Sequence, residues 1–364
     1  MVNAPTVGLV VNPVAGLGGS AGLKGSDGAD VQRAALDRGA VPRAGERAAR
    51  AVRALLTARP DVRLVTAPGA MGEDSVRAAG GACTVLGPPS GAATTAADTV
   101  TAVRALAGAD LILFAGGDGT ARDVLDAGPS IPVLGIPAGV KVYSGCFALS
   151  PAAAGLLAAE WTGDTTEAEV VDLDEEQYRR GAVTPKLYGT LRVPAAGRKL
   201  SSRKAGSSGT APGSAESIAR EVVARMAPGV TYILGPGATT AAVGRRLGLA
   251  TTLLGVDVVR DGELVAADVA EEGLLPLAEG AVVVLSAIGG QGFVLGRGNQ
   301  QISPRVLRRT QDLLVLATQQ KLAALHGRPL LLDTGDQDTD QRLSGHVRVI
   351  TGYRESTIYR MENA

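Results

Sequence analysis

Short apolar runs alternate with helical patterns along the first 150 residues. Between the runs, the segments Gly45–Arg59 and Ala92–Ala107 carry apolar side chains at helical spacing. This alternation predicts βαβ units, and therefore a mostly parallel sheet with helices on both faces. Ligands of such sheets bind beyond the carboxyl ends of the strands. The runs predicted as buried strands are Val7–Val11, Val62–Thr66, Cys83–Leu86, Leu111–Ala115 and Ile131–Ile136.

The second half continues with mixed helical and extended patterns. They predict a first domain over residues 1–150 and a second α/β or α+β domain over residues 151–364, whose tail is a candidate to pack back on the first. Residues 196–217 are rich in Gly, Ser, Pro and basic side chains, so we expect a flexible loop there. The other predicted elements are helices over Ala152–Glu160 and Ile218–Met226, strands over Thr231–Leu234, Ala281–Leu285, Leu313–Thr318 and Pro329–Leu332, and hairpins over Leu253–Ala267 and over His346–Thr351 with Ser356–Met361.

Composition argues against two classes of partner. Lys plus Arg and Asp plus Glu both number 36 among 364 residues, and aromatic residues make up only 3%. A chain with no net charge and few aromatic side chains is a poor binder of nucleic acid. No apolar run approaches the roughly 20 residues that a membrane-spanning helix needs, so we expect no membrane partner.

Cysteine usage and the N-terminus indicate the compartment. The only cysteines are Cys83 and Cys146, which make no disulfide framework, and no cysteine or histidine cluster has zinc spacing. The N-terminal segment MVNAPTVGLVVNPVAG lacks the basic start and long apolar core of a signal peptide. We therefore expect a cytoplasmic protein.

The strongest chemical signal is the sequence GGDGT at positions 116–120, which follows the predicted strand Leu111–Ala115 and precedes a helical pattern. Glycines let backbone N–H groups turn inward, and a helix N-terminus favours an anion such as phosphate. A carboxylate would repel phosphate, so Asp118 suits a base, or a partner of Mg²⁺, beside bound phosphates. We expect Asp118 on a loop, outside the core. The alternative is a tight turn with an Asx-type aspartate.

Two further loops leave strands of the same predicted sheet. NPVAGLGG at 12–19 follows the first strand, and GIPAGVKVYS at 135–144 leaves the fifth. The loop at 12–19, together with GGDGT, could hold a nucleotide polyphosphate, although an ordinary βα connection would look similar. In the loop at 135–144, Lys141 could neutralise phosphate charge and Ser144 could contact a ribose. A surface lysine and core packing are the alternatives.

NPVAGLGG, GGDGTARDV and GIPAGVKVYS, in this order, resemble the ATP-NAD kinase family, which shares GGDGT with lipid kinases of the same superfamily. The resemblance covers essentially the whole chain and implies a Rossmann-like N-terminal sheet. Later segments are similar to the polyphosphate/ATP-NAD kinase branch that includes the acetoin-catabolism-associated protein X. These segments are GPGATT at 235–240, GVDVVRDG at 255–262, GGQGFVLGRGNQQIS at 289–303 and VRVITGYRE at 347–355.

The resemblance implies transfer of the ATP γ-phosphoryl group to the 2′-hydroxyl of the adenosine ribose of NAD or NADH. It implies Mg²⁺ bound through ATP, polyphosphate as an alternative donor, and a homo-oligomer. Asp118 would be the catalytic residue that accepts the hydroxyl proton. The phosphate-binding residues would be Asn12, Gly16, Gly18, Gly116, Gly117, Gly119, Thr120 and Lys141.

One family motif is missing from the chain. Typical members carry Asn-Glu-x-Asp, whose Asn and Asp help to bind NAD, but none of the four asparagines here is followed by glutamate. We therefore expect a rebuilt acceptor site, mainly in glycine-rich loops of the second half, where GPGATT follows a strand and opens a helix. The acceptor-binding candidates are Ser144, Gly237, Thr239, Thr240, Asp257, Gln291 and Asn299.

Two other functions stay open at this point. A lipid kinase is disfavoured because GVKVYS stands where lipid kinases of the superfamily carry Gly-Thr-x-Asn-Asp. A nucleotide-binding regulatory protein without turnover is the other alternative, and it would have no need for the carboxylate of Asp118.

Overall fold

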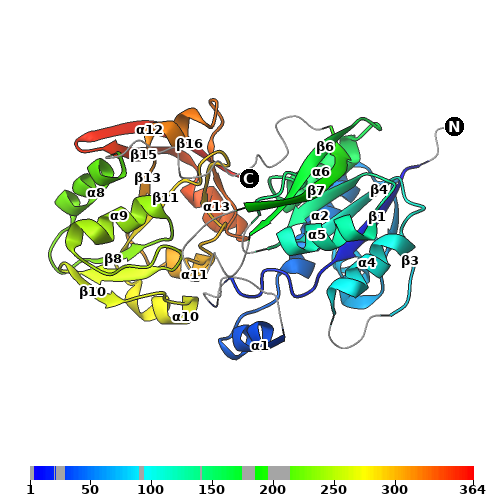
Figure 1. The fold of residues 1–364 in the computed structure, drawn as a ribbon, viewed down its shortest axis with the longest axis horizontal. Coiled ribbons are helices and arrows are strands. Elements are labelled where there is room, and N and C mark those ends of the chain that lie inside the picture. The colour runs from blue at the N-terminus through cyan, green and yellow to red at the C-terminus, as the bar shows by residue number, and fades with distance from the viewer. Residues whose placement is uncertain are drawn as a thin grey trace. The chain divides into compact units, whose positions relative to one another are not determined.

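The computed structural model describes residues 4–19, 21, 29–89, 94–139, 142–173, 185–195 and 214–364. The chain divides into two compact units, each with a large β-sheet of its own (Figure 1). Within the described residues, no helix is long and apolar enough to cross a membrane. The first unit comprises residues 1–17, 25–36 and 41–203, and the second comprises residues 18–24, 37–40 and 204–364.

The first unit is built on a parallel sheet of five strands in the order β3-β2-β1-β4-β5. All five predicted strands are present, and the parallel α/β fold is confirmed. The chain moves outward from β1 to β3 and then returns to the other side of β1, so the strand order reverses between β1 and β4. The strands are β1 (Thr6–Val11), β2 (Arg63–Thr66), β3 (Thr84–Val85), β4 (Leu111–Gly116) and β5 (Val133–Pro137).

Helices cover both faces of this sheet, as predicted. Leu9 and Leu113 belong to a core that includes residues of α2 and α6, whereas Val10 and Phe114 belong to a core with residues of α4 and α5. Neighbouring residues of one strand point to opposite faces, so the continuous apolar runs in the sequence fill both cores. The helices are α1 (Ala29–Asp37), α2 (Ala44–Ala58), α3 (Glu73–Ala78), α4 (Ala96–Ala105), α5 (Asp118–Ala127) and α6 (Pro151–Glu160), with the short 3₁₀ helix η1 (Gly69–Met71).

The segment that follows β5 turns back and bonds to that strand. The backbone N–H of Gly135 donates to the carbonyl of Cys146 at 2.8 Å, and the N–H of Ala148 donates to the carbonyl of Gly135 at 2.9 Å. The ring of Phe147 lies so close to Gly135 that an added Cβ would be 2.3 Å from it. Glycine is therefore required here, because the returning segment occupies the space of a side chain.

An antiparallel pair of strands, β6 (Thr165–Leu173) and β7 (Pro185–Pro194), flanks the same segment and was not predicted from the sequence. The N–H of Gly145 donates to the carbonyl of Glu169 in β6 at 2.9 Å. Residues 142–148 are therefore held by β5 on one side and by β6 on the other.

The second unit is built on a mixed sheet of nine strands in the order β10-β9-β8-β11-β13-β15-β16-β14-β12. Strands β8, β11, β13 and β15 run parallel, and β9 and β10 form the predicted hairpin. The expectation of a second α/β or α+β domain is confirmed. The strands are β8 (Thr231–Leu234), β9 (Asp257–Arg260), β10 (Glu263–Ala266), β11 (Val282–Ser286), β12 (Phe293–Leu295), β13 (Asp312–Leu316), β14 (Leu330–Leu332), β15 (Gly345–Gly352) and β16 (Glu355–Asn363).

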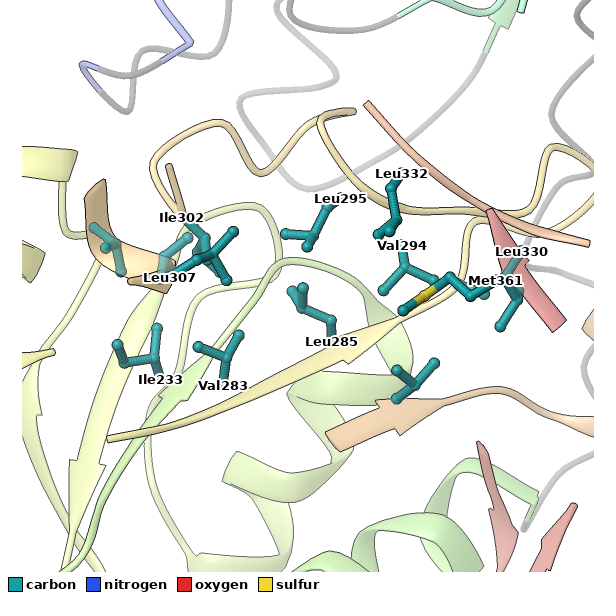
Figure 2. Close-up of a cluster of buried hydrophobic side chains, with 14 of the residues drawn as sticks. Ile233, Val283, Leu285, Val294, Leu295, Ile302, Leu307, Leu330, Leu332 and Met361 are labelled. Carbon is teal, nitrogen blue, oxygen red and sulfur yellow. The ribbon is translucent and has the colours of Figure 1, made fainter. Parts of the chain in front are cut away.

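Two apolar cores also stabilise this second sheet. Figure 2 shows the larger one, in which Val283 and Leu285 of β11 lie among side chains such as Leu295, Leu332 and Met361. The other core joins Leu234 and Val284 to residues of α8 and α9. The helices of the unit are α8 (Ser214–Arg225), α9 (Ala238–Leu247), α10 (Glu271–Leu274), α11 (Pro304–Leu307), α12 (Gln319–Ala323) and α13 (Gln337–Leu343), with the 3₁₀ helix η4 (Leu275–Leu277).

The helix that follows the predicted loop begins earlier than the sequence indicated. Helix α8 begins at Ser214, so the last four residues of the loop predicted over 196–217 are helical, while residues 196–213 lie outside the described part of the chain. The hydroxyl of Ser217 accepts a hydrogen bond from the N–H of Tyr353 at 2.9 Å. This contact, more than 130 residues away in sequence, fixes a segment whose composition is typical of a loop.

We expect the substitution Gly135→Ala to lower the free energy of unfolding by about 1–3 kcal/mol, because the new methyl group would overlap the ring of Phe147. Gly108→Ala is the matched control, since an added Cβ there meets no atom within 4 Å. Urea denaturation of both variants measures the difference. Equal stability of the two variants would contradict the close approach of Phe147.

Candidate active site

Three loops meet at the carboxyl edge of the first sheet. The side-chain amide of Asn12, after β1, donates to the hydroxyl of Thr120 in α5 at 2.9 Å. The N–H groups of Ala138 and Gly139, after β5, both donate to the carbonyl of Gly116 at the end of β4, at 2.8 and 2.9 Å. The predicted placement of the loops at 12–19 and 116–120 at one edge of the sheet is therefore observed, and residues 138–139 after β5 lie at the same edge. It lies at the reversal of strand order between β1 and β4, where open α/β sheets bind ligands.

Glycine allows the first loop to approach the third. Gly16 has a φ of +76°, and a Cβ at this position would lie 2.1 Å from the carbonyl oxygen of Ala138. Any other residue would meet both a strained backbone conformation and a steric clash. Gly16 is therefore required by its backbone conformation and by the close approach of the two loops.

Asp118 does not lie on a loop outside the core, as we expected. It is the first residue of α5, and only 6% of its surface is exposed. Its Oδ2 accepts a hydrogen bond from the N–H of Tyr143 at 2.7 Å. Its Oδ1 accepts one from the N–H of Ser144 at 2.9 Å and one from the Ser144 hydroxyl at 2.6 Å. The returning segment after β5 therefore supplies three donors to the carboxylate at the start of the helix.

Burial changes the acidity of this carboxylate. Desolvation raises the pKa of Asp118 to about 7, although the hydrogen bonds from Ser144 and Tyr143 oppose this rise. The nearby carboxylate of Asp172 in β6 adds to the rise, and Asp172 is paired with Arg122 of α5 at 3.2 Å. Asp118 is thus able to hold and release a proton near neutral pH, a property required of a base.

Two other titratable groups lie close to Asp118. Burial raises the pKa of the Tyr143 phenol and of the Cys146 thiol, and the charge of Asp118 adds to both rises. Both groups therefore stay neutral at pH 7. Of these three groups, Asp118 is therefore the one that titrates near neutral pH.

The remaining phosphate-binding candidates fall into three groups. Gly117 directly precedes α5, and Gly119 lies in its first turn, at the same edge as Asn12. Gly18 is buried and belongs to the second unit. Lys141 lies outside the described residues.

In the second unit, two predicted residues lie at the start of α9, and a lysine that the sequence did not single out lies beside them. Gly237 directly precedes α9, and Thr239 is in its first turn. The ammonium group of Lys321 donates to the hydroxyl of Thr239 at 3.1 Å and to the hydroxyl of Ser286 at 2.7 Å. Because β8, β11 and β13 run parallel, these residues all lie at the edge of the sheet where the three strands end.

Other acceptor-binding candidates use their polar atoms inside the second unit. The hydroxyl of Thr240 donates to the carbonyl of Gly237 at 2.8 Å. The carboxylate of Asp257 accepts hydrogen bonds from Thr252 and from the N–H of Asp268.

The side chain of Asn299 also forms its hydrogen bonds inside the second unit, with backbone atoms of Val294 and Gly296. Both Asn299 and Gln291 are buried, each with 5% of its surface exposed. Thr240, Asp257 and Asn299 therefore have observed structural roles within the second unit.

The described residues hold no group of three or more His, Cys, Asp or Glu side chains that could bind a metal ion. Asp118 belongs to no such group, and its carboxylate accepts hydrogen bonds from two N–H groups and one hydroxyl.

Two models of known protein families match the chain. Residues 7–164 match the ATP-NAD kinase N-terminal domain, and residues 228–361 match the ATP-NAD kinase C-terminal domain. The two matches together take in most of the chain, including the GGDGT loop and the strands of the second sheet. No curated protein and no solved structure matches the chain.

The raised pKa of Asp118 predicts a pH-dependent stability. Between its usual value of 3.8 and about 7, the folded protein binds more proton at Asp118 than the unfolded chain does. This stabilisation is complete below pH 3.8 and is lost as the pH rises through 7. Relative to Asp118→Asn, the free energy of unfolding of the natural protein should fall by up to about 1 kcal/mol per pH unit between pH 5 and 7.

Urea denaturation at several pH values measures this difference. Asp126→Asn is the matched control, because Asp126 is an exposed aspartate on the same helix. A difference between the natural protein and Asp118→Asn that stays constant from pH 5 to pH 7 would contradict the burial of an ionisable Asp118.

Proposed function

Because the chain belongs to the ATP-NAD kinase family and phosphorylates NAD to NADP with ATP as donor, we propose that Asp118 is the general base of this reaction. A ribose hydroxyl is a weak acid and becomes a better nucleophile when its proton is transferred to a nearby carboxylate. The observation that supports this role is the buried Asp118 carboxylate, with a pKa of about 7, at the edge where three glycine-containing loops meet. General base catalysis of this kind contributes about 10²–10⁴-fold to a rate.

We propose that the loops around Asp118 bind the phosphates. Asn12, Gly16, Gly116, Gly117, Gly119 and Thr120 lie at one edge of the sheet, at the start of α5, and Lys141 would add a positive charge. Backbone N–H groups and a helix N-terminus stabilise negative charge. Phosphoryl transfer needs little covalent help from a protein, so positioning and charge neutralisation would supply most of the remaining acceleration.

The cation and the acceptor contacts are also proposals. Since the described residues form no metal cluster, we propose that Mg²⁺ arrives with ATP, where it neutralises phosphate charge. In place of the missing Asn-Glu-x-Asp motif, Gly237, Thr239 and Gln291 remain candidates to contact the acceptor. We further propose a homo-oligomer, which sedimentation of the purified protein tests.

We expect Asp118→Asn to lower kcat for NADP formation at least 100-fold, because amide nitrogen and oxygen cannot accept the hydroxyl proton. Asp126→Asn, with its exposed side chain on the same helix, should retain nearly full activity. The assay supplies ATP, Mg²⁺ and NAD and separates NADP by chromatography, and circular dichroism checks that both variants are folded. An Asp118→Asn variant with full activity would exclude the base.

A second experiment resolves donor and acceptor. The natural protein is incubated with ATP or polyphosphate and with NAD or NADH. We expect NADP in the mixture of ATP with NAD, and product in any of the other three mixtures identifies a further donor or acceptor. Absence of NADP(H) in all four mixtures, combined with tight nucleotide binding in calorimetry, would support the regulatory protein without turnover instead.

A further inference from the structure

Ser144 does not have the surroundings of a ribose contact, which was its predicted role. The residue is fully buried. Its hydroxyl lies 2.6 Å from Oδ1 of Asp118, accepts the N–H of Val171 in β6 at 3.1 Å, and lies 2.9 Å from the carbonyl oxygen of Val171. A hydroxyl enclosed in this way acts on Asp118 and not on a bound nucleotide.

The hydrogen bonds distinguish the two oxygens of Asp118. A carboxylate oxygen can accept about two hydrogen bonds. Oδ1 accepts two, from the N–H and the hydroxyl of Ser144, whereas Oδ2 accepts one, from the N–H of Tyr143. The contacts of the described residues thus leave one acceptor position, and it is on Oδ2.

We propose that Ser144 is a positioning residue that saturates Oδ1 of Asp118, so that Oδ2 is the atom that accepts the proton of the acceptor hydroxyl. This inference rests on the proposed role of Asp118 as the base. In the step, the O–H bond of the acceptor breaks and an O–H bond forms on Oδ2. The acceptor oxygen bonds to the γ-phosphorus, and the bond from that phosphorus to the ADP oxygen breaks. The proton later leaves Oδ2 to solvent.

The hydroxyl of Ser144 can be satisfied in both protonation states of Asp118. With Asp118 ionised, the short bond to Oδ1 is charge-assisted and therefore strong. With Asp118 protonated, the Ser144 hydroxyl can rotate and donate to the carbonyl of Val171 instead. No buried donor of Ser144 loses its partner when the proton moves, which would otherwise be costly.

Among the described residues, Asp172, Tyr143 and Cys146 are titratable groups that interact electrostatically with Asp118. Asp172 of β6 raises the pKa of Asp118 and is paired with Arg122 of α5. Tyr143 and Cys146 lie on the same segment as Ser144, and burial keeps both neutral. The Ser144 hydroxyl is the largest of the influences that lower the pKa of Asp118. Its removal should therefore move the titration upward.

The test is the pH dependence of kcat/KM for NAD in Ser144→Ala, because kcat/KM reports the ionisation of the free enzyme. Loss of a hydrogen bond to a carboxylate should move the acid limb of the profile upward by about one pH unit or more, from about 7 in the natural protein. Activity at pH 7 should then fall several-fold and recover toward pH 9. A merely structural role would lower kcat/KM at all pH values and leave the limb in place.

Ser150→Ala is the matched control, because Ser150 is a buried serine of the same unit whose hydroxyl caps α6 and does not contact Asp118. Its profile should keep the position of the natural protein. Ser144→Cys, which has a weaker donor of similar size, should show a smaller upward movement, and it replaces Ser144→Ala if that variant does not fold. An unmoved limb in both Ser144 variants, or an equal movement in Ser150→Ala, overturns the proposal.

A second readout does not depend on activity. Carboxyl ¹³C NMR follows the titration of Asp118, whose signal is identified by its absence in Asp118→Asn. We expect the titration of Asp118 to move upward in Ser144→Ala, and an unchanged titration overturns the role of Ser144. If the natural protein forms no NADP(H), the proposed function fails, whereas this measurement still decides whether Ser144 controls Asp118.

Discussion

The hydrogen bonding of one buried carboxylate organises the site of the first unit. Asp118 receives two backbone N–H groups and one hydroxyl from residues 143 and 144, and these residues in turn bond to β5 and β6 through their neighbours. A buried charge without such donors would be strongly destabilising, because the protein interior does not replace the lost hydration. The start of α5, the return of the chain after β5 and the β6–β7 pair therefore depend on one another.

The same burial links structure to chemistry. A solvated aspartate has a pKa near 4 and is a weak base at neutral pH. Removal of water raises the pKa of Asp118 to about 7, and the three donors prevent a still larger rise. The balance between desolvation and hydrogen bonding thus places the carboxylate in the range in which a general base works well. The folded protein is less stable above pH 7, since the ionised carboxylate of Asp118 stays buried.

Much of the fold follows from local patterns. All five predicted strands of the first sheet are present, and β8 has the predicted bounds. A short apolar run between turn residues is typical of a buried strand, so the pattern alone indicates these elements. The GGDGT and NPVAG loops were also predicted at one edge, since the carboxyl ends of parallel strands meet there. The β6–β7 pair, the start of α8 at Ser214 and Lys321 beside Thr239 were missed, because each depends on partners far away in the sequence.

The sequence by itself determined the family, the parallel sheet and the identity of the candidate base, since these depend on strand spacing and on a motif of five consecutive residues. Only the tertiary structure decided that Asp118 is buried and that Ser144 bonds to it, across 26 positions of chain. It also decided that Thr240, Asp257 and Asn299 use their polar atoms for hydrogen bonds inside the second unit. The physical reason is that a polar side chain looks the same in a sequence whether it bonds to its own protein or to a ligand, and only the positions of its partners distinguish the two.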